Sequence, residues 1–198
     1  ARGLTYLRNH ELARALVGLE IFEHLPHGIW TSALMLVFTR EALHGDAADW
    51  GYQNSLFFAS TIVGAALAVA ISGWVAQRPG WAIIADAFIG GVFTLGYALS
   101  PNLAVALVFC ALMGPATALR DVAQDSLLQA GVDDAFMGRV QAMRTMGAQA
   151  VFMGGGVLFA WVADQLDVRW IYLTGGTLYL LTGLFALSSR AIRRSRIG

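Results

Sequence analysis

The sequence has no lysine, a single cysteine and few charges, because only 13% of its 198 residues are charged. An ordinary soluble domain carries about 25% charged residues. The low charge therefore argues against a water-soluble fold, and the 57% apolar content excludes an intrinsically disordered chain. With only Cys110, the chain forms no internal disulfide and no cysteine-rich metal site. The formal net charge is zero, which predicts no general attraction to nucleic acid.

Long apolar segments make up most of the chain. A bilayer core about 30 Å thick is crossed by roughly 20 residues of helix. Transmembrane strands would be about 10 residues long with alternating polarity, whereas these segments are longer and apolar on all sides. We predict an all-α, polytopic membrane protein with six transmembrane helices. The expected spans cover residues 12–38, 50–76, 81–99, 103–129, 139–163 and 170–189, with a cytoplasmic linker at 1–11 and a basic cytoplasmic tail at 190–198.

The arginines predict the orientation of this bundle. An even number of spans places both termini on one side, together with the turns at Arg78 and at 131–138. That side carries nine arginines in its termini and turns or at the adjoining span ends, and the opposite side carries two, Arg40 and Arg169. Cytoplasmic loops are enriched in basic residues, so both termini are predicted to be cytoplasmic.

Exclusive use of arginine is typical of GC-rich bacterial genomes, and we expect a multi-pass protein of the inner (plasma) membrane.

Small residues and prolines inside the spans predict close helix packing and bent helices. Gly64 belongs to a four-residue repeat of small side chains in the second span, a pattern that lets helix backbones approach each other. Pro26 and Pro115 each lack a backbone donor, so they are expected to kink the first and fourth spans.

Four ionisable side chains lie inside the first expected span. Glu20, Glu23, His24 and His27 follow the spacing i, i+3, i+4 and i+7, which places them on one helix face. A charge at mid-bilayer costs several kcal/mol, so this face must look into the bundle or a water-filled cavity. Because histidine titrates near neutral pH, we expect a pathway for protons or substrate. A hydrogen-bonded structural patch and a metal site are the alternatives.

A second polar cluster lies at the cytoplasmic end of the fourth span. Asp121 and Asp125 are like charges one turn apart, which is unfavourable unless a cation lies nearby. We expect Arg120 and Arg139 to supply it, giving a charge cluster that can act as a gate. A helix that simply emerges into water is the alternative. Asp86, near the start of the third span, is expected at the membrane interface.

The turn between the second and third spans carries a family pattern. It reads Gly-Trp-Val-Ala-Gln-Arg-Pro-Gly-Trp over residues 73–81. This resembles a degenerate copy of the loop signature Gly-x-Leu-Ala-Asp-Arg-x-Gly-Arg-Lys of the major facilitator superfamily. Gln77 stands where the signature has aspartate, so the conformational latch made by that aspartate is not expected here. The positions that match are Gly73, Ala76, Arg78 and Gly80.

Other segments extend the resemblance to nearly the whole chain. Residues 129–140 and 156–170 are similar to loops in the second half of these carriers, and residues 6–8 to the end of their central cytoplasmic loop. The chain thus resembles spans seven to twelve of a twelve-span carrier, nearest to the bacterial drug-efflux and siderophore-export branch. The resemblance implies a half bundle whose partner is an N-terminal six-helix half of the same gene or a second copy.

The resemblance implies half of a secondary active transporter and not an enzyme. Its expected activity is proton-coupled export of a small amphipathic molecule of drug or siderophore type by alternating access. The expected partners are that substrate, protons and the lipid bilayer, with no nucleic acid, metal, cofactor or catalytic residue. Three alternatives are a lysophospholipid carrier of the same fold, a non-transporting membrane interaction module, and an intramembrane metalloenzyme using Glu20, His24 and His27.

Overall fold

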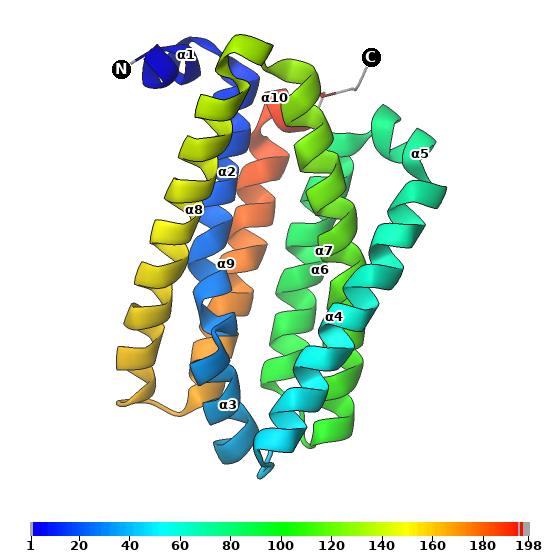
Figure 1. Ribbon diagram of the computed structural model, residues 1–198. Helices are drawn as coiled ribbons and strands as arrows, with labels where there is room; N and C mark the ends of the chain where they lie inside the picture. The colour runs from blue at the N-terminus through cyan, green and yellow to red at the C-terminus, as the bar shows by residue number, and fades with distance from the viewer. Residues whose placement is uncertain (1, 194, 196–198) are drawn as a thin grey trace.

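The computed structural model describes residues 2–193 and Ser195, and within them every regular element is a helix (Figure 1). The all-α fold predicted from the long apolar segments is therefore confirmed. In chain order the elements are α1 (Arg2–Asn9), α2 (Glu11–His27), the 3₁₀ turn η1 (Gly28–Trp30), α3 (Ser32–Glu41), α4 (Ala47–Ala70), α5 (Ser72–Gln77), α6 (Pro79–Ala98), α7 (Leu103–Gly131), α8 (Asp134–Ala163), α9 (Val168–Ser188) and α10 (Arg190–Arg193).

Five helices, α4 and α6 to α9, are each long and apolar enough to cross a membrane. The first expected span is divided among α2, η1 and α3, which together follow α8 from one end of the bundle to the other (Figure 1). The expected span at 50–76 is likewise divided between α4 and α5. The chain is thus a multi-pass helical membrane bundle, and α1 and α10, near its two termini, lie at the same end.

The ends of the chain differ from a simple linker and tail. The expected linker at 1–11 contains α1 and the first residue of α2, which begins after the N-cap His10. The imidazole of His10 accepts a hydrogen bond from the backbone N–H of Ala13 at 3.2 Å. The expected tail at 190–198 begins with α10, and its residues 194 and 196–198 lie outside the described residues.

The break after α2 has a local cause in the sequence. Pro26 lacks the backbone N–H of an ordinary helical residue. The chain then tightens into η1, and Thr31 adopts an extended backbone with φ −61° and ψ 146°, which ends the helical path. Pro115 has no such effect, since α7 continues through it as one helix.

Glycines let the helices approach at two crossings. A methyl group on Gly28 would lie 2.6 Å from the backbone nitrogen of Gly156 and 2.7 Å from the carbonyl carbon of Gly155. Gly64 of α4 lies against the backbone of Pro115 in α7. In both places the neighbouring atoms belong to backbone, which cannot turn aside as a long side chain can. The break in α2 is therefore held directly against α8.

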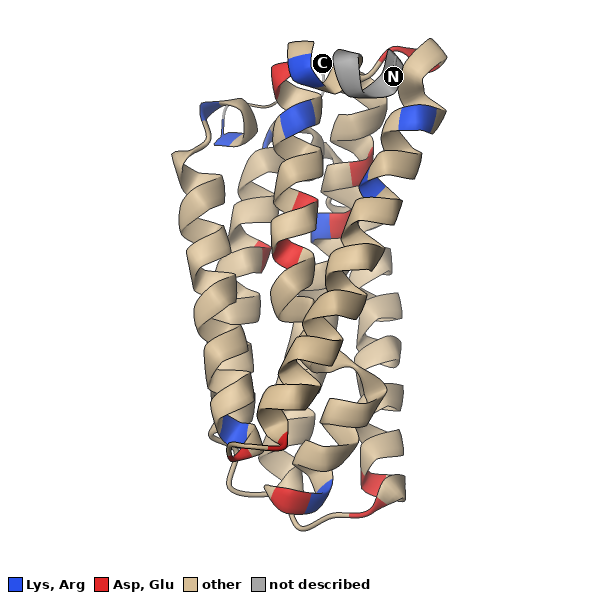
Figure 2. Cartoon of the chain, turned by 90° about the vertical axis from the view of Figure 1, so that its left-hand side faces the viewer, with Lys and Arg blue, Asp and Glu red and all other residues tan. Residues whose placement is uncertain are grey.

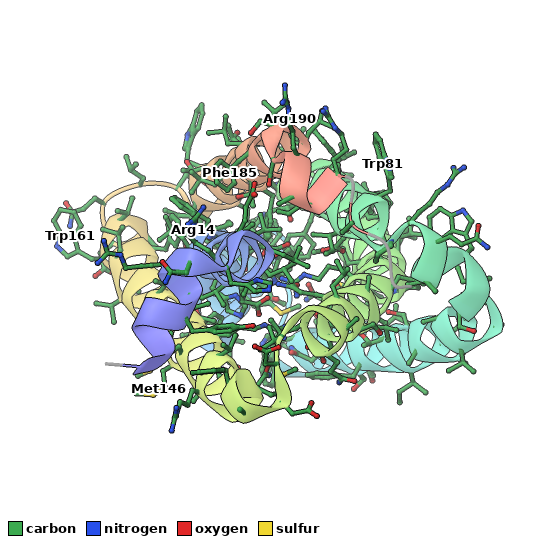
Figure 3. All side chains as sticks on the ribbon, turned by 90° about the horizontal axis from the view of Figure 1, so that it is seen from above. Arg14, Trp81, Met146, Trp161, Phe185 and Arg190 are labelled. Atoms are coloured by element: carbon green, nitrogen blue, oxygen red, sulfur yellow. The ribbon has the colours of Figure 1, made fainter. Side chains whose placement is uncertain are left out.

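The helices of the bundle pack mainly in pairs. In the structure α4 packs on α7, α6 on both α7 and α9, and α2 on α8. Seen from above, α8 and α4 lie on opposite flanks, and Met146 and Trp161 of α8 point away from the bundle (Figure 3). These two side chains are more than half exposed, as expected for surfaces that face lipid or another set of helices.

The buried apolar side chains form two separate clusters, one toward each end of the bundle. Leu16, Ile83 and Leu127 belong to the cluster nearer the termini. Phe38 and Tyr172 belong to the cluster at the opposite end. Along α2, α6, α7 and α8, buried charged residues occur between the positions that supply these two clusters, so the core has a polar layer within it.

We predict that Gly28→Ala destabilises the bundle by about 1–3 kcal/mol, because the new methyl overpacks the contact with the α8 backbone. Gly18→Ala is the matched control in the preceding helix α2, since a methyl there meets nothing within 4 Å. Alanine has the higher helix propensity, so the control should be neutral or stabilise by up to about 1 kcal/mol. Thermal unfolding in lipid nanodiscs measures both, and equal melting temperatures for the two variants would contradict the close approach.

Candidate functional site

Five charged side chains from four helices meet inside the bundle, and we call them the buried charge cluster. Each is less than a tenth exposed. Figure 2 shows charged positions inside the bundle, nearer the end that carries the termini. The members are Glu20 and Glu23 of α2, Asp86 of α6, Arg120 of α7 and Arg144 of α8.

Arg120 is at the centre of the cluster. Its Nη2 donates to Oε2 of Glu23 at 2.5 Å, and its Nη1 donates to Oδ1 of Asp121 at 2.6 Å. Two other carboxylates lie at the limit of an ion pair, with Oε2 of Glu20 at 4.0 Å from Nη2 and Oδ2 of Asp86 at 3.9 Å from Nε. One guanidinium therefore faces four acids from three helices.

Arg144 holds the other side of the cluster. Its Nη1 donates to Oδ1 of Asp125 at 2.5 Å, and its Nη2 donates to Oε2 of Glu20 at 3.3 Å. The same Glu20 oxygen accepts a hydrogen bond from Nε2 of Gln124 at 2.5 Å. Glu20 thereby connects α2 to both α7 and α8.

The cations beside the two α7 aspartates differ in part from those expected. Arg120 does contact Asp121, but the cation beside Asp125 is Arg144 and not Arg139. Arg139 is exposed, with its guanidinium carbon 5.8 Å from the centre of the Phe136 ring. Arg144 lies one turn and a half further into α8, on the face that meets α2, and the spacing of Arg139 alone does not reveal this.

Both histidines of α2 are fixed by the helix backbone. Nδ1 of His24 lies 2.8 Å from the carbonyl oxygen of Glu20, and Nδ1 of His27 lies 2.8 Å from that of Glu23. A carbonyl oxygen only accepts, so Nδ1 of each ring is the donor in these contacts. The two rings stack with centroids 5.1 Å apart, and the nearest carboxylate oxygen to His24 is Oε1 of Glu20 at 3.7 Å.

Two neighbouring cavities open on this side of the cluster and share His27 and Thr117 in their walls. One, of about 380 Å³, is lined mainly by charged and amide side chains, among them Glu20, Asp125 and Arg144. The other, of about 220 Å³, is lined mainly by aromatic and sulfur-containing side chains. Its walls are His27, Trp30, Met35, Asn54, Phe57, Phe58, Cys110, Met113, Thr117, Phe152 and Tyr179.

The residues of the loop pattern lie apart from the cluster, at the turn between α5 and α6. Gly73, Gln77 and Arg78 are exposed. Gly80 is buried, and its α-carbon packs against the backbone carbonyl of Ile192 in α10. No ion pair of Arg78 occurs among the described residues. In this structure Gly80 of the pattern allows α6 to pack closely on α10.

Asp86, which the sequence predicts at the membrane interface, is buried between helices. Only 8% of the residue is exposed, and it faces Arg120 across the contact between α6 and α7. Its distance from the start of the third span suggested the membrane surface, but the end of the bundle that carries the termini extends beyond that start through α1, α5 and α10. In the sequence, the polar C-terminal part of the fourth span is the feature that indicates a bundle extending beyond the start of the third span.

A second buried polar network escaped the sequence reasoning, at the opposite end of the bundle. The hydroxyl of Tyr97 donates to Oε1 of Gln53 at 2.6 Å, and Nε2 of Gln53 donates to the hydroxyl of Thr39 at 2.9 Å. This chain joins α3, α4 and α6. Arg169 completes that end by donating to the carbonyl oxygens of Ala42, Ala98 and Ser100. In the sequence, Gln53 in an otherwise apolar span is the feature that could have indicated this network.

The fold and the buried charges together define a helical, multi-pass membrane protein with a polar interior. The known proteins that the chain resembles are named as transporters, and the chain matches about half the length of each. The chain is 28% identical over 179 residues to the uncharacterized MFS-type transporter YjbB of Bacillus subtilis, covering 89% of this chain and 44% of that protein. It is 25% identical over 192 residues to the uncharacterized MFS-type transporter YfmI of the same organism, covering 97% and 47%.

The chain thus spans about half the length of the curated relatives it matches, in which MFS denotes the major facilitator superfamily. No protein-family model matches the sequence. The relatives support the expected half bundle of major-facilitator type. Their names do not extend to the drug-efflux and siderophore-export branch.

We predict that Arg144→Gln destabilises the bundle by about 3 kcal/mol, because it leaves the buried Glu20 with only the more distant Arg120, at 4.0 Å, as a cation. The value lies at the low end for a broken buried ion pair, since the Asp125 side chain is half-exposed. Arg139→Gln is the control and should change stability by less than about 0.5 kcal/mol, as surface substitutions generally do. Thermal unfolding in nanodiscs compares the two. A larger loss in the Arg139 variant would show that the pairing is wrong.

Proposed function

We propose that the chain is one half of a secondary active transporter of a bacterial plasma membrane. The proposed activity is export of a small amphipathic molecule, of drug or siderophore type, in exchange for protons by alternating access. The likeness to two MFS-type transporters supports the carrier class. The excess of arginine at the end with α1 and α10 supports cytoplasmic termini (Figure 2).

The partner in this proposal is another six-helix half, from the same gene or from a second copy of the chain. Two observations support it. The chain matches only about half of each relative. In addition, α4 and α8 expose apolar side chains such as Ile62, Val69 and Val157, while half-exposed Asp121 and Asp125 line the polar cavity beside them. A charged cavity open at the side of a bundle cannot face lipid, so a second set of helices is needed to enclose it.

The pair of neighbouring cavities carries the proposal for the substrate. Sites for small molecules have volumes of about 300–1,000 Å³, a range that the two cavities together reach. Aromatic walls suit an apolar body, and the polar cavity suits a charged or hydrogen-bonding end. His27 and Thr117 at the junction would meet the molecule where its character changes. An amphipathic molecule matches this arrangement better than a wholly polar or wholly apolar one.

Glu20 connects the cavity to the helices and supports the proposal of proton coupling. It lines the polar cavity and accepts hydrogen bonds from Gln124 of α7 and Arg144 of α8. A proton on Glu20 would remove its negative charge and weaken both links. Arg144 would then be left with Asp125 alone, and α2 would be freer to move against α8. In this account Glu20, Glu23, His24 and His27 form the pathway, and Arg120, Asp121, Asp125 and Arg144 form the gate.

We predict that Glu20→Gln reduces efflux driven by a pH gradient at least tenfold, because the amide cannot take up and release the proton. Ethidium serves as a fluorescent amphipathic probe, measured in proteoliposomes that contain the protein at its native length. Glu11→Gln is the matched control at the exposed start of the same helix. Its efflux should equal that of the unmodified protein. Equal efflux for both variants would remove Glu20 from proton coupling and favour a structural role for the cluster.

A further inference from the structure

The buried charge cluster contains more acid than base. Glu20, Glu23 and Asp86 are three carboxyl groups, whereas Arg120 and Arg144 are two cations. If all five were ionised, a net negative charge would remain among apolar side chains, where an unpaired charge is costly. The two rim aspartates, Asp121 and Asp125, add negative charge to the same arginines. Neutrality among these five side chains therefore requires one bound proton.

The hydrogen bonds distinguish the three buried acids. Glu20 accepts from Gln124 and Arg144, and Glu23 accepts from Arg120 at 2.5 Å. Asp86 accepts no hydrogen bond within the described part of the chain, and its nearest cationic atom is Nε of Arg120 at 3.9 Å. A neutral carboxyl group needs such partners least. Asp86 is thus the acid whose surroundings best suit the protonated form.

We propose that Asp86 holds the proton that balances the cluster and that Arg120 exchanges between Glu23 and Asp86. Two unpartnered atoms support the exchange. Nε of Arg120 and Oε1 of Glu23 are both buried and have no hydrogen-bond partner among the described residues. The guanidinium can therefore turn toward Asp86 without breaking a bond at Nε, and Glu23 has an oxygen free to receive a proton.

The exchange conserves charge within the cluster. As Arg120 leaves Glu23, the O–H bond of Asp86 breaks and an O–H bond forms on Glu23, so one proton moves and Arg120 remains a cation. Asp86 then becomes the carboxylate that Arg120 pairs with. Glu20, one turn before Glu23 in α2, lines the polar cavity and leads the proton toward it. The holding of the proton by Asp86 is independent of transport, and only the exchange rests on the proposed function.

The other groups around Asp86 do not replace Arg120 as its cation. Besides Arg120, α7 contributes Asp121, α2 contributes Glu23 and α9 contributes Tyr179, none of which is a cation. The arginines of neighbouring segments, Arg78 before α6 and Arg190 and Arg193 in α10, form no ion pair with Asp86 in the described residues.

Infrared spectroscopy of the native-length protein in nanodiscs tests the proposal without any transport. At neutral pH we expect the C=O stretching band of one protonated carboxylic acid in the unmodified protein. Asp86→Asn should abolish it, and Asp86→Glu should restore it at a shifted frequency, which a merely structural role would not produce. Asp164→Asn, at an exposed position at the end of α8, is the control and should leave the band unchanged.

Several outcomes would overturn the proposal. They are an unmodified protein without the band, a band that persists in Asp86→Asn, and a band that vanishes in Glu20→Gln instead. If Asp86→Asn does not fold, the presence and shift of the band in Asp86→Glu decides. A band assigned to Asp86 in a protein that exports no ethidium supports the proton site and contradicts the transporter. Ethidium export without the band supports the transporter and contradicts the proton site on Asp86.

Discussion

A carboxylate that lies inside a membrane bundle must be paired with a cation or carry a proton, because the apolar surroundings do not solvate it. Arg120 meets this need for Glu23 and is shared with Glu20, Asp86 and Asp121. Since lipid tails are as apolar as leucine, apolar contact alone does little to specify how such helices pair. The charge cluster links α2, α6, α7 and α8, and it fixes which faces of these helices meet.

Close backbone contacts complete what the charges begin. The break at Gly28 lies directly on the glycines of α8, and Gly64 lies on Pro115 of α7. These contacts bring α2 and α4 close to α8 and α7 while leaving two cavities beside the cluster. The polar cavity reaches Glu20, and the apolar cavity reaches the aromatic residues beyond the break. The polar and the apolar cavity thus lie next to each other because the chain breaks at Gly28 and because glycines allow close helix crossings at Gly28 and Gly64.

The sequence was sufficient for the fold class and for one face of the site. Apolar segment length predicted the helical membrane bundle, and the spacing of Glu20 to His27 predicted an inward-facing polar stripe that the structure does bury in part. The sequence could not predict which residues of other helices contact this stripe, because helix spacing relates residues only within one helix. Arg144 and Asp86 become members of the cluster only through the contacts of α8 with α2 and of α6 with α7. The need for glycine at position 28 is likewise visible only in the structure, where it lies against the backbone of Gly155 and Gly156.

A double-mutant cycle on Glu23 and Arg120 tests the central pairing most directly. The unfolding free energies of Glu23→Gln, Arg120→Gln and the double variant give the coupling between the two side chains. Both are almost fully buried and lie 2.5 Å apart, so we expect a coupling of about 1–3 kcal/mol, with the double variant more stable than Arg120→Gln alone. Additive losses, with a coupling near zero, would contradict the view that this ion pair organises the bundle.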